Sequence, residues 1–205
     1  MIISIGRQYG SGGHLIAEGL AEKLNLPLYD RKIIEETAKV TGLSQDYIKD
    51  IESKQPHSFF LSGLDMGLAN SGLAVPLSDQ VFIAQSEVIR EAAKKPCIIV
   101  GRCADYVLSD EQCLKVYCYG SLNRRIERVK EEYGVQTNDY RAFIKKMDKK
   151  RAGYYEYFTG YKWGNCYNFD LMINTDNGIE WAIEQIEHAY HYYLTHPKYL
   201  SNHSH

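Results

Sequence analysis

A glycine-rich turn near the start of the chain has the residue types of a phosphate-binding loop. Residues 10–13 read Gly-Ser-Gly-Gly, follow a short apolar run at 2–6 and precede apolar residues at helical spacing over 15–24. A strand, a glycine-rich turn and a helix N-terminus in this order present backbone N–H groups and the positive end of the helix dipole to an anion. We therefore predict that a nucleotide's phosphates bind at Gly10, Ser11, Gly12, Gly13 and His14.

The turn departs from the P-loop pattern, in which a glycine and four further residues precede Gly-Lys-Ser/Thr. When Gly12 is aligned with the last glycine, Gly13 stands at the lysine, His14 at the Mg²⁺-binding hydroxyl and Arg7 at the first glycine. The loop thus lacks the cation that grips the β- and γ-phosphates, and we expect Arg7 or an arginine of a lid to supply that charge. The alternatives are a turn that only joins a strand to a helix, and a histidine that caps the helix or lies on the surface.

Cations are concentrated on two charged helices expected in the second half of the chain. Phosphoryl transfer needs donors around a highly charged transition state, and two helices with a short connection form a lid, predicted here over about 124–165. The candidates for the catalytic charges are Arg7, Arg102, the arginines of 124–128 and the basic run 145–151. The alternative is that these helices are solvated and that their cations pair with neighbouring acids. The cations concerned are Arg124, Arg125, Arg128 and the basic run 145–151, and the acids are Glu127, Glu131 and Asp148.

Three further charged residues follow predicted strands. Asp30 ends the second strand, 25–30, and Arg102 and Asp105 come just after a fully apolar strand, 96–101. Ligands of parallel α/β sheets bind outside the carboxyl ends of the strands, and an arginine there is costly unless it meets an anion or a carboxylate. We predict that these three residues bind the phosphoryl acceptor. Asp105 as a simple ion-pair partner of Arg102, and Asp30 as a helix N-cap or a Mg²⁺ contact, stay open.

Alternating strands and helices predict a parallel α/β sheet of about five strands in a single domain, 1–205. Between two of the helices, residues 54–78 mix glycine and proline with Phe59 and Phe60, and we predict a flap there that closes over the acceptor or joins a second copy of the chain. Further strands are expected at 2–6, 114–119 and 170–174, and helices at 15–24, 31–40, 45–53, 79–94, after an N-cap at Ser121, from Thr137 or Asn138, and at 179–193.

Composition excludes some classes of protein. A net charge of -2 provides no basic footprint for nucleic acid. No stretch approaches the roughly 18 apolar residues of a membrane span, and the first residues do not resemble a signal peptide. The 5 cysteines are odd in number and match no zinc pattern, which predicts reduced thiols and a cytoplasmic protein without a bound structural metal.

The chain resembles the cytidylate kinase-like family of P-loop proteins over residues 1–193. The matching segments are 4–13 (SIGRQYGSGG), 29–31 (YDR), 99–105 (IVGRCAD) and 151–160 (RAGYYEYFTG). The resemblance implies a three-layer P-loop fold with a helical lid and transfer of the ATP γ-phosphoryl to CMP or dCMP with Mg²⁺. It also implies that Arg102 binds the monophosphate and that Arg151 and Arg128 grip the transferring group. The family's Gly-Arg-Asp segment has Cys103 in place of the aspartate, which puts pyrimidine specificity in question.

Two other functions compete with a kinase. A nucleotide-binding regulatory module would keep the phosphate cradle without the lysine and the Mg²⁺-binding hydroxyl. A dinucleotide-binding oxidoreductase would explain Gly10 and Gly12 after a strand and Asp30 at the end of the next, but Leu15 occupies the position of the third glycine.

Overall fold

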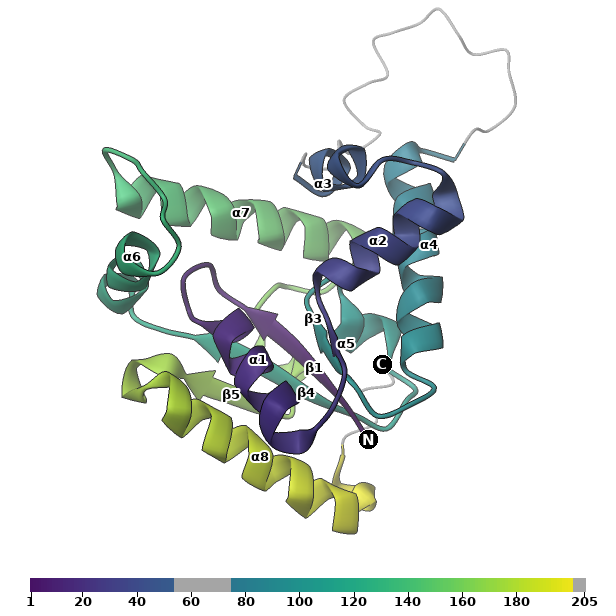
Figure 1. Ribbon diagram of the computed structural model, residues 1–205, viewed down its shortest axis with the longest axis vertical. Coiled ribbons are helices and arrows are strands. Elements are labelled where there is room, and N and C mark those ends of the chain that lie inside the picture. Colours follow the sequence, from purple (N-terminus) through teal and green to yellow (C-terminus); the bar gives the residue numbers. More distant parts are fainter. Residues whose placement is uncertain (54–74, 201–205) are drawn as a thin grey trace, which may run out of the picture.

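The fold is built on a parallel sheet of five strands. The structure, a computed structural model, describes residues 1–53 and 75–200. The strands lie in the order β2-β3-β1-β4-β5 (Figure 1), and every neighbouring pair is parallel. This arrangement confirms the predicted fold class. The strands are β1 (Ile2–Arg7), β2 (Leu28–Tyr29), β3 (Ile98–Val100), β4 (Cys113–Tyr119) and β5 (Leu171–Asn174).

Helices cover both faces of the sheet because its strands are apolar on both sides. Successive residues of β1 point to opposite faces: Ile3 and Ile5 join the core under α1 (Gly13–Leu24) and α8 (Ile179–Thr195), whereas Ile2 joins the core on the other face. That second face is covered by α2 (Arg31–Thr41), α4 (Leu77–Ala92) and the short α5 (Ala104–Val107). Helix α3 (Gln45–Ser53) packs against α2 and α4 through Ile48.

Two more helices, α6 (Leu122–Glu131) and α7 (Tyr140–Thr159), lie at the carboxyl end of the sheet (Figure 1). The Ser121 hydroxyl accepts a hydrogen bond from the Arg124 amide, so the predicted N-cap of α6 is confirmed. The predicted start of α7 at Thr137 or Asn138 is wrong, because the carboxylate of Asp139 accepts from the Ala142 amide and caps the helix there.

The remaining differences from prediction concern element ends. Strand β2 is shorter than 25–30, since Asn25 ends α1 in a left-handed conformation with φ 49°. Helix α4 begins at Leu77, so the predicted flap at 54–78 ends too late, and residues 54–74 of that flap lie outside the described residues. Helix α5 was not predicted, and three short 3₁₀ turns occupy Cys166–Asn168, Thr175–Asn177 and Pro197–Tyr199.

The described residues contain neither a disulfide nor a helix that could cross a membrane. None of the five cysteines, all of which lie in the described part, forms a disulfide. Within residues 1–53 and 75–200, no helix combines the length and the apolar character that crossing a membrane requires.

Candidate functional site

The glycine-rich loop joins β1 to α1 in a conformation that needs its glycines. Gly10 and Gly12 have φ of 77° and 79°, a left-handed region that other residues rarely adopt. The buried Ser11 hydroxyl donates to the Gln8 carbonyl oxygen at 2.9 Å, and the Gln8 side chain accepts from the Gly120 amide. Gly12 is the N-cap of α1, and no side chain caps that helix. The first amides of α1 therefore lack a side-chain acceptor at the point where an anion would bind.

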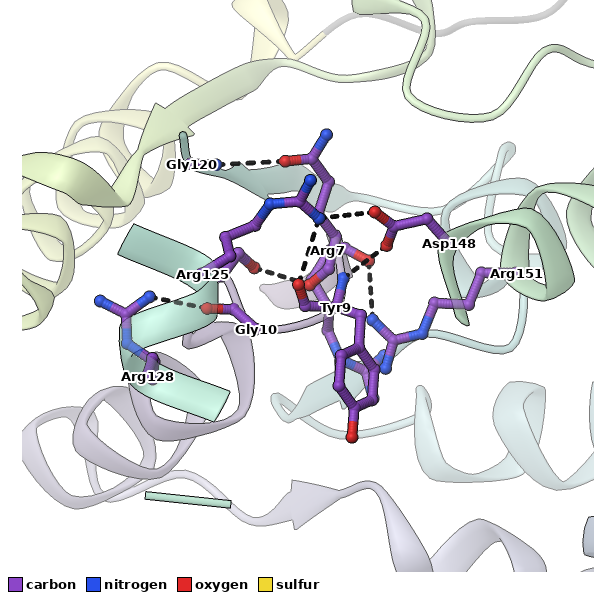
Figure 2. A network of polar contacts seen from close by, with 10 residues as sticks. Arg7, Tyr9, Gly10, Gly120, Arg125, Arg128, Asp148 and Arg151 are labelled. Carbon is purple, nitrogen blue, oxygen red and sulfur yellow. Dashed lines mark hydrogen bonds and ion pairs between the residues drawn. The ribbon is translucent and has the colours of Figure 1, made fainter. Parts of the chain in front are cut away.

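Arginines of α6 and α7 bind the carbonyl oxygens of this loop (Figure 2). Arg128 Nη1 donates to the Gly10 oxygen at 2.8 Å, Arg125 Nη1 to the Tyr9 oxygen at 3.1 Å, and Arg151 Nη1 to the Arg7 oxygen at 3.1 Å. Carbonyl oxygens repel phosphate oxygens. Because these three carbonyl oxygens accept from arginines, they point away from the place where a phosphate would bind. The contacts involving Asp148 belong to the same network.

Asp148 ties α7 to the loop and to α6. Its Oδ1 accepts from the Tyr9 amide at 2.7 Å, and its Oδ2 lies 2.5 Å from Arg125 Nη1. Arg125 is buried, and the guanidinium of Arg151 lies over the Tyr9 ring, 5.2 Å from its centre. The two helices and the loop thus form one polar network. The alternative of solvated helix faces holds for Arg124, which is exposed and pairs with Glu127 at 3.0 Å.

The side chain of Arg7 occupies the space in which a lysine at residue 13 would begin. A Cβ added to Gly13 would lie 2.8 Å from Arg7 Cβ and 3.1 Å from Arg7 Cδ. The Arg7 guanidinium extends past Gly101 to Asp30, where Nη2 lies 3.8 Å from Oδ2. Burial and the neighbouring Arg151 lower the pKa of Arg7 to about 10, which leaves it charged at neutral pH. A cation therefore stands beside the loop although the P-loop lysine is missing.

A cavity of about 300 Å³ opens between the carboxyl ends of β1 and β3 and helix α7. It brings together Arg7, Asp30, Arg102, Asp105 and Arg151, which are five of the predicted site residues. Arg128 and the predicted phosphate-binding residues of the loop are not part of its lining. The other lining residues are Gly6, Lys49, Gly101, Cys103, Met147, Lys150, Tyr154, Tyr155, Trp163 and Phe169.

Asp30 is the carboxylate shared by the cations of this cavity. Its Oδ1 lies 3.3 Å from Arg102 Nη1, and its Oδ2 lies 2.9 Å from His14 Nδ1 without the alignment of a hydrogen bond. Burial alone would raise the pKa of Asp30, but Arg7, Arg102 and His14 together lower it. Asp30 occupies the predicted N-cap position of α2, but its side chain makes no capping hydrogen bond. The predicted phosphate contact His14 instead faces Asp30 and Glu18.

Asp105 is not the ion-pair partner of Arg102, which was one of the two alternatives left open by the sequence. Arg102 pairs with Asp30, while Asp105 Oδ2 accepts from the Tyr155 hydroxyl at 2.6 Å. Burial raises the pKa of Asp105 to about 6, against the lowering effect of that hydrogen bond and of Lys115. Asp105 and Tyr155 form a hydrogen-bonded pair at the wall of the cavity.

Some residues of this site were missed. Gln8 and Tyr155 had no distinguishing signal, since polar and aromatic residues surround both in the sequence. Arg125 and Asp148 were visible only as members of charged helices, and their shared contact joins residues 23 positions apart. The positive φ values of Arg102 and Cys103, 53° and 54°, had no sequence signal either.

Comparison with known proteins agrees with this architecture. The family model described as "Cytidylate kinase-like family" matches residues 2–177. The chain belongs to the cytidylate kinase-like family. A cytidylate kinase of Methanopyrus kandleri is 23% identical over 181 residues, which are 88% of this chain and 87% of that protein.

Solved structures similar to this member of the cytidylate kinase-like family include an uncharacterized protein from Eubacterium ventriosum. It is 29% identical, with a TM-score of 0.69, and the match covers 92% of this chain and 97% of that one. A shikimate kinase from Bacteroides thetaiotaomicron shares the fold at 13% identity, with a TM-score of 0.56 and coverage of 93% and 98%. Family and fold together support nucleotide kinase activity in general.

Proposed function

We propose that this protein transfers the γ-phosphoryl group of ATP to a nucleoside monophosphate. The observation that carries the proposal is the cluster of Arg7, Arg102 and Arg151 in a cavity next to the glycine-rich loop, where Asp30 pairs with Arg7 and Arg102. These groups leave an excess of positive charge, and burial lowers the pKa of both Arg7 and Arg151. Such a cluster is costly unless an anion neutralises it, and phosphates of a donor and an acceptor would do so.

The loop fits the ATP side of the reaction. The uncapped first amides of α1 would bind the phosphates, whereas the Ser11 amide donates to the Gln8 carbonyl oxygen at 3.3 Å and holds the turn. A Cβ on Gly12 would clash with Ile179. Mg²⁺ bound to ATP supplies charge neutralisation at the transferring group. In the described residues no three His, Cys, Asp or Glu side chains converge, so phosphate and water oxygens would hold most of its coordination sites, and Asp30 in the cavity lining could supply a carboxylate oxygen.

Arg7 fits the role of the missing lysine. It leaves β1 directly before the loop, fills the space above Gly13 and carries its charge towards the acceptor cavity. In the proposed reaction Arg7 neutralises the β- and γ-phosphates, while Arg151, which is held by the Arg7 carbonyl oxygen and the Tyr9 ring, stabilises the transferring phosphoryl group. Arg128 keeps the loop in place from its far side.

The acceptor side combines cations with aromatic rings. Arg102 would bind the acceptor phosphate, with Asp30 fixing its guanidinium. Tyr154, Trp163 and Phe169 line the same cavity and offer ring faces to a base. A phosphate group joined to a planar base matches this pairing of charge and aromatic surface.

A second candidate is a nucleotide-binding module without catalysis. The observation in its favour is that the loop lacks both the lysine and the Mg²⁺-binding hydroxyl, and that Arg125 and Arg128 are engaged with backbone carbonyl oxygens. In this alternative the lid arginines stabilise the loop, and the protein binds a nucleotide without transferring a phosphoryl group.

The first experiment is calorimetry of ATP with Mg²⁺, followed by a coupled ADP-release assay with CMP, dCMP, UMP and AMP. Binding and acceptor-dependent ADP release are expected. ATP binding without turnover on any of the four acceptors would favour the non-catalytic module. No binding of ATP would remove both candidates.

A second experiment tests Arg7 as the substitute cation. Arg7→Ala should lower turnover by about 100-fold or more, as expected for the loss of one preorganised charge. The removal of Arg7 also opens the space above Gly13, so the double variant Arg7→Ala/Gly13→Lys should recover at least tenfold of that loss. Gly13→Lys alone should be poorly active, because its Cβ meets the Arg7 stem. The matched control is Arg124→Ala, an exposed arginine of α6, and equal turnover of Arg7→Ala and Arg124→Ala would contradict the assignment.

A further inference from the structure

A second cavity, of about 400 Å³, lies on the other side of the Asp105–Tyr155 pair from the acceptor cavity. It is formed by the end of α4, the helix α5 with the residues after it, and the turn Cys166–Asn168. We call it the lysine cavity. Its lining residues are Arg90, Asp105, Tyr106, Val107, Ser109, Asp110, Glu111, Lys115, Tyr155, Tyr161 and Asn168.

Lys115 is the unusual member of this lining. It lies in the middle of the sheet, on β4 opposite Ser4 of β1, and only 2% of its surface is exposed. Within the described part of the chain, the Lys115 side-chain nitrogen forms no hydrogen bond and no ion pair within 4.0 Å, and it is not completely enclosed by protein atoms, so it faces the cavity. Lysine is almost never this buried without a partner. The cavity is where such a partner would bind.

The acids of the lysine cavity do not replace that partner. Asp105 interacts with Lys115 electrostatically, but it forms no ion pair with it within 4.0 Å, and its Oδ2 accepts a hydrogen bond from the Tyr155 hydroxyl. Asp110 and Glu111 are exposed at the rim, where water screens their charge. Arg90, in the last turn of α4, is exposed at the rim in the same way, so its charge is screened as well.

Neutral polar groups complete the floor of the cavity. The Asn168 side-chain nitrogen donates to the Tyr155 hydroxyl at 3.3 Å, which in turn donates to Asp105. Tyr106 and Tyr161 stand edge to face, 5.7 Å between ring centres, at one side. A buried lysine without a hydrogen-bond acceptor, next to a polar floor, suits a small anion.

We propose that the lysine cavity binds a small anion, a carboxylate or a phosphate, through Lys115. The site is separate from the loop and from the acceptor cavity, and the wall of Asp105 and Tyr155 is common to both cavities. Its occupancy therefore does not depend on the proposed kinase reaction. The competing explanation is that Lys115 only stabilises the Asp105 carboxylate and that the cavity holds water.

The test is calorimetry of the full chain with inorganic phosphate and, separately, with malonate. For at least one of these anions, the wild type should bind at a site where Lys115→Met binds at least tenfold more weakly. In the variant that site should be too weak to appear as a separate class. Preference for phosphate or for malonate identifies which anion the cavity accepts. Arg102→Ala, which alters the acceptor cavity, should keep the site that Lys115→Met loses. Identical binding by the wild type and Lys115→Met would overturn the proposal.

A second variant keeps the test valid if Lys115→Met fails to fold. Arg90→Glu reverses an exposed charge at the rim and should weaken the same class of site several-fold. Lys198→Glu makes the same change in net charge far along the chain, in the turn Pro197–Tyr199, and should leave anion binding unchanged. Equal effects of Arg90→Glu and Lys198→Glu would also overturn the proposal.

The melting temperature without ligand separates the two explanations. If an anion is the partner of Lys115, replacing the lysine by methionine in the ligand-free protein removes a buried charge that has no hydrogen-bond acceptor, and it should raise the melting temperature. A lowered melting temperature together with unchanged anion binding would show that Lys115 serves Asp105 alone.

Discussion

Two turns follow neighbouring strands of the sheet, β1 and β3, and both contain residues with positive φ. They differ in which residue types adopt that conformation. After β1, the glycine-rich loop has positive φ at Gly10 and Gly12, both glycines. After β3, the turn of Gly101, Arg102 and Cys103 has φ of 75°, 53° and 54°, so two residues with side chains adopt the left-handed conformation in succession. Such a conformation costs roughly 1–2 kcal/mol for each residue with a Cβ.

The difference follows from what each turn presents. The loop would bind phosphates through backbone amides, for which glycine suffices and strain is unnecessary. The turn after β3 presents a side chain, Arg102, which glycine does not have. Its strain is offset by the contact between Arg102 and Asp30 at 3.3 Å and by the hydrogen bond from Tyr155 to Asp105 at 2.6 Å. Positive φ at residues with a Cβ therefore occurs in the turn that presents the Arg102 side chain, and glycine provides it in the loop.

The largest expected effect is on stability, and it comes from a substitution in the glycine-rich loop after β1. Gly10→Ala forces a Cβ into a left-handed conformation and places it 2.8 Å from the Arg125 carbonyl oxygen. We expect a loss of roughly 2–5 kcal/mol in the free energy of unfolding, measured by urea denaturation, from backbone strain and overpacking together. Gly42→Ala is the matched control, because Gly42 has φ of 72° and nothing within 4 Å of its added Cβ. Equal losses in the two variants would show that the contact between α6 and the loop is dispensable.

The next effect is a dependence of stability on pH, and it comes from Asp105, which closely follows the turn after β3. Burial raises the pKa of Asp105 from 3.8 to about 6 in the folded chain. The folded state then binds a proton more tightly than the unfolded chain, so this group's contribution to stability is lost as pH rises from about 4 to about 6. Asp105→Asn still accepts from Tyr155 but does not ionise. Relative to the wild type, its free energy of unfolding should rise by about 3 kcal/mol between about pH 4 and pH 7. A pH-independent difference in urea denaturation would contradict the raised pKa.

The third effect is on nucleotide affinity, and it tests the role of Arg102 in the turn after β3. Arg102→Ala should weaken binding of the acceptor nucleotide by about 100-fold, about 2.8 kcal/mol, because it removes a buried cation from an anionic ligand. ATP affinity should change by less than about threefold, since Arg102 lines the acceptor cavity and the loop amides bind ATP. Calorimetry with each nucleotide measures both values. Equal losses, or none, would refute the assignment of Arg102 to the acceptor.

The parts of this site that could be predicted from the sequence are those that depend on chain direction. Carboxyl ends of parallel strands meet at one edge, so Arg7, Asp30, Arg102 and Asp105 converge once the strands are recognised. The glycine composition of residues 10–13 likewise indicates a turn with positive φ. Neither inference needs the exact ends of the strands, which is why the error in β2 did no harm.

The remaining features depend on packing between distant segments. Tyr155, the partner of Asp105, lies 50 residues away and is one of 17 tyrosines, so no local pattern distinguishes it. The arginines of the predicted lid were expected on phosphates, whereas in the structure they bind loop carbonyl oxygens, because only the tertiary fold sets which face of α6 meets the loop. Positive φ at Arg102 and Cys103 contradicts their local preference, so it too comes from the surrounding contacts.

The smallest expected effect measures the strain itself. Arg102→Gly and Arg102→Ala both remove the guanidinium, but only glycine relieves the left-handed conformation, so Arg102→Gly should be more stable by about 1 kcal/mol in urea denaturation. Lys146, exposed in the interior of α7, is the matched control, because there glycine should be less stable than alanine by about 0.5–1 kcal/mol. Both variants of Arg102 should lose acceptor binding equally, which would separate the strain of the turn from the charge that it presents. A glycine variant no more stable than the alanine variant would mean that the turn after β3 is as relaxed as the loop, and the contrast between the two turns would disappear.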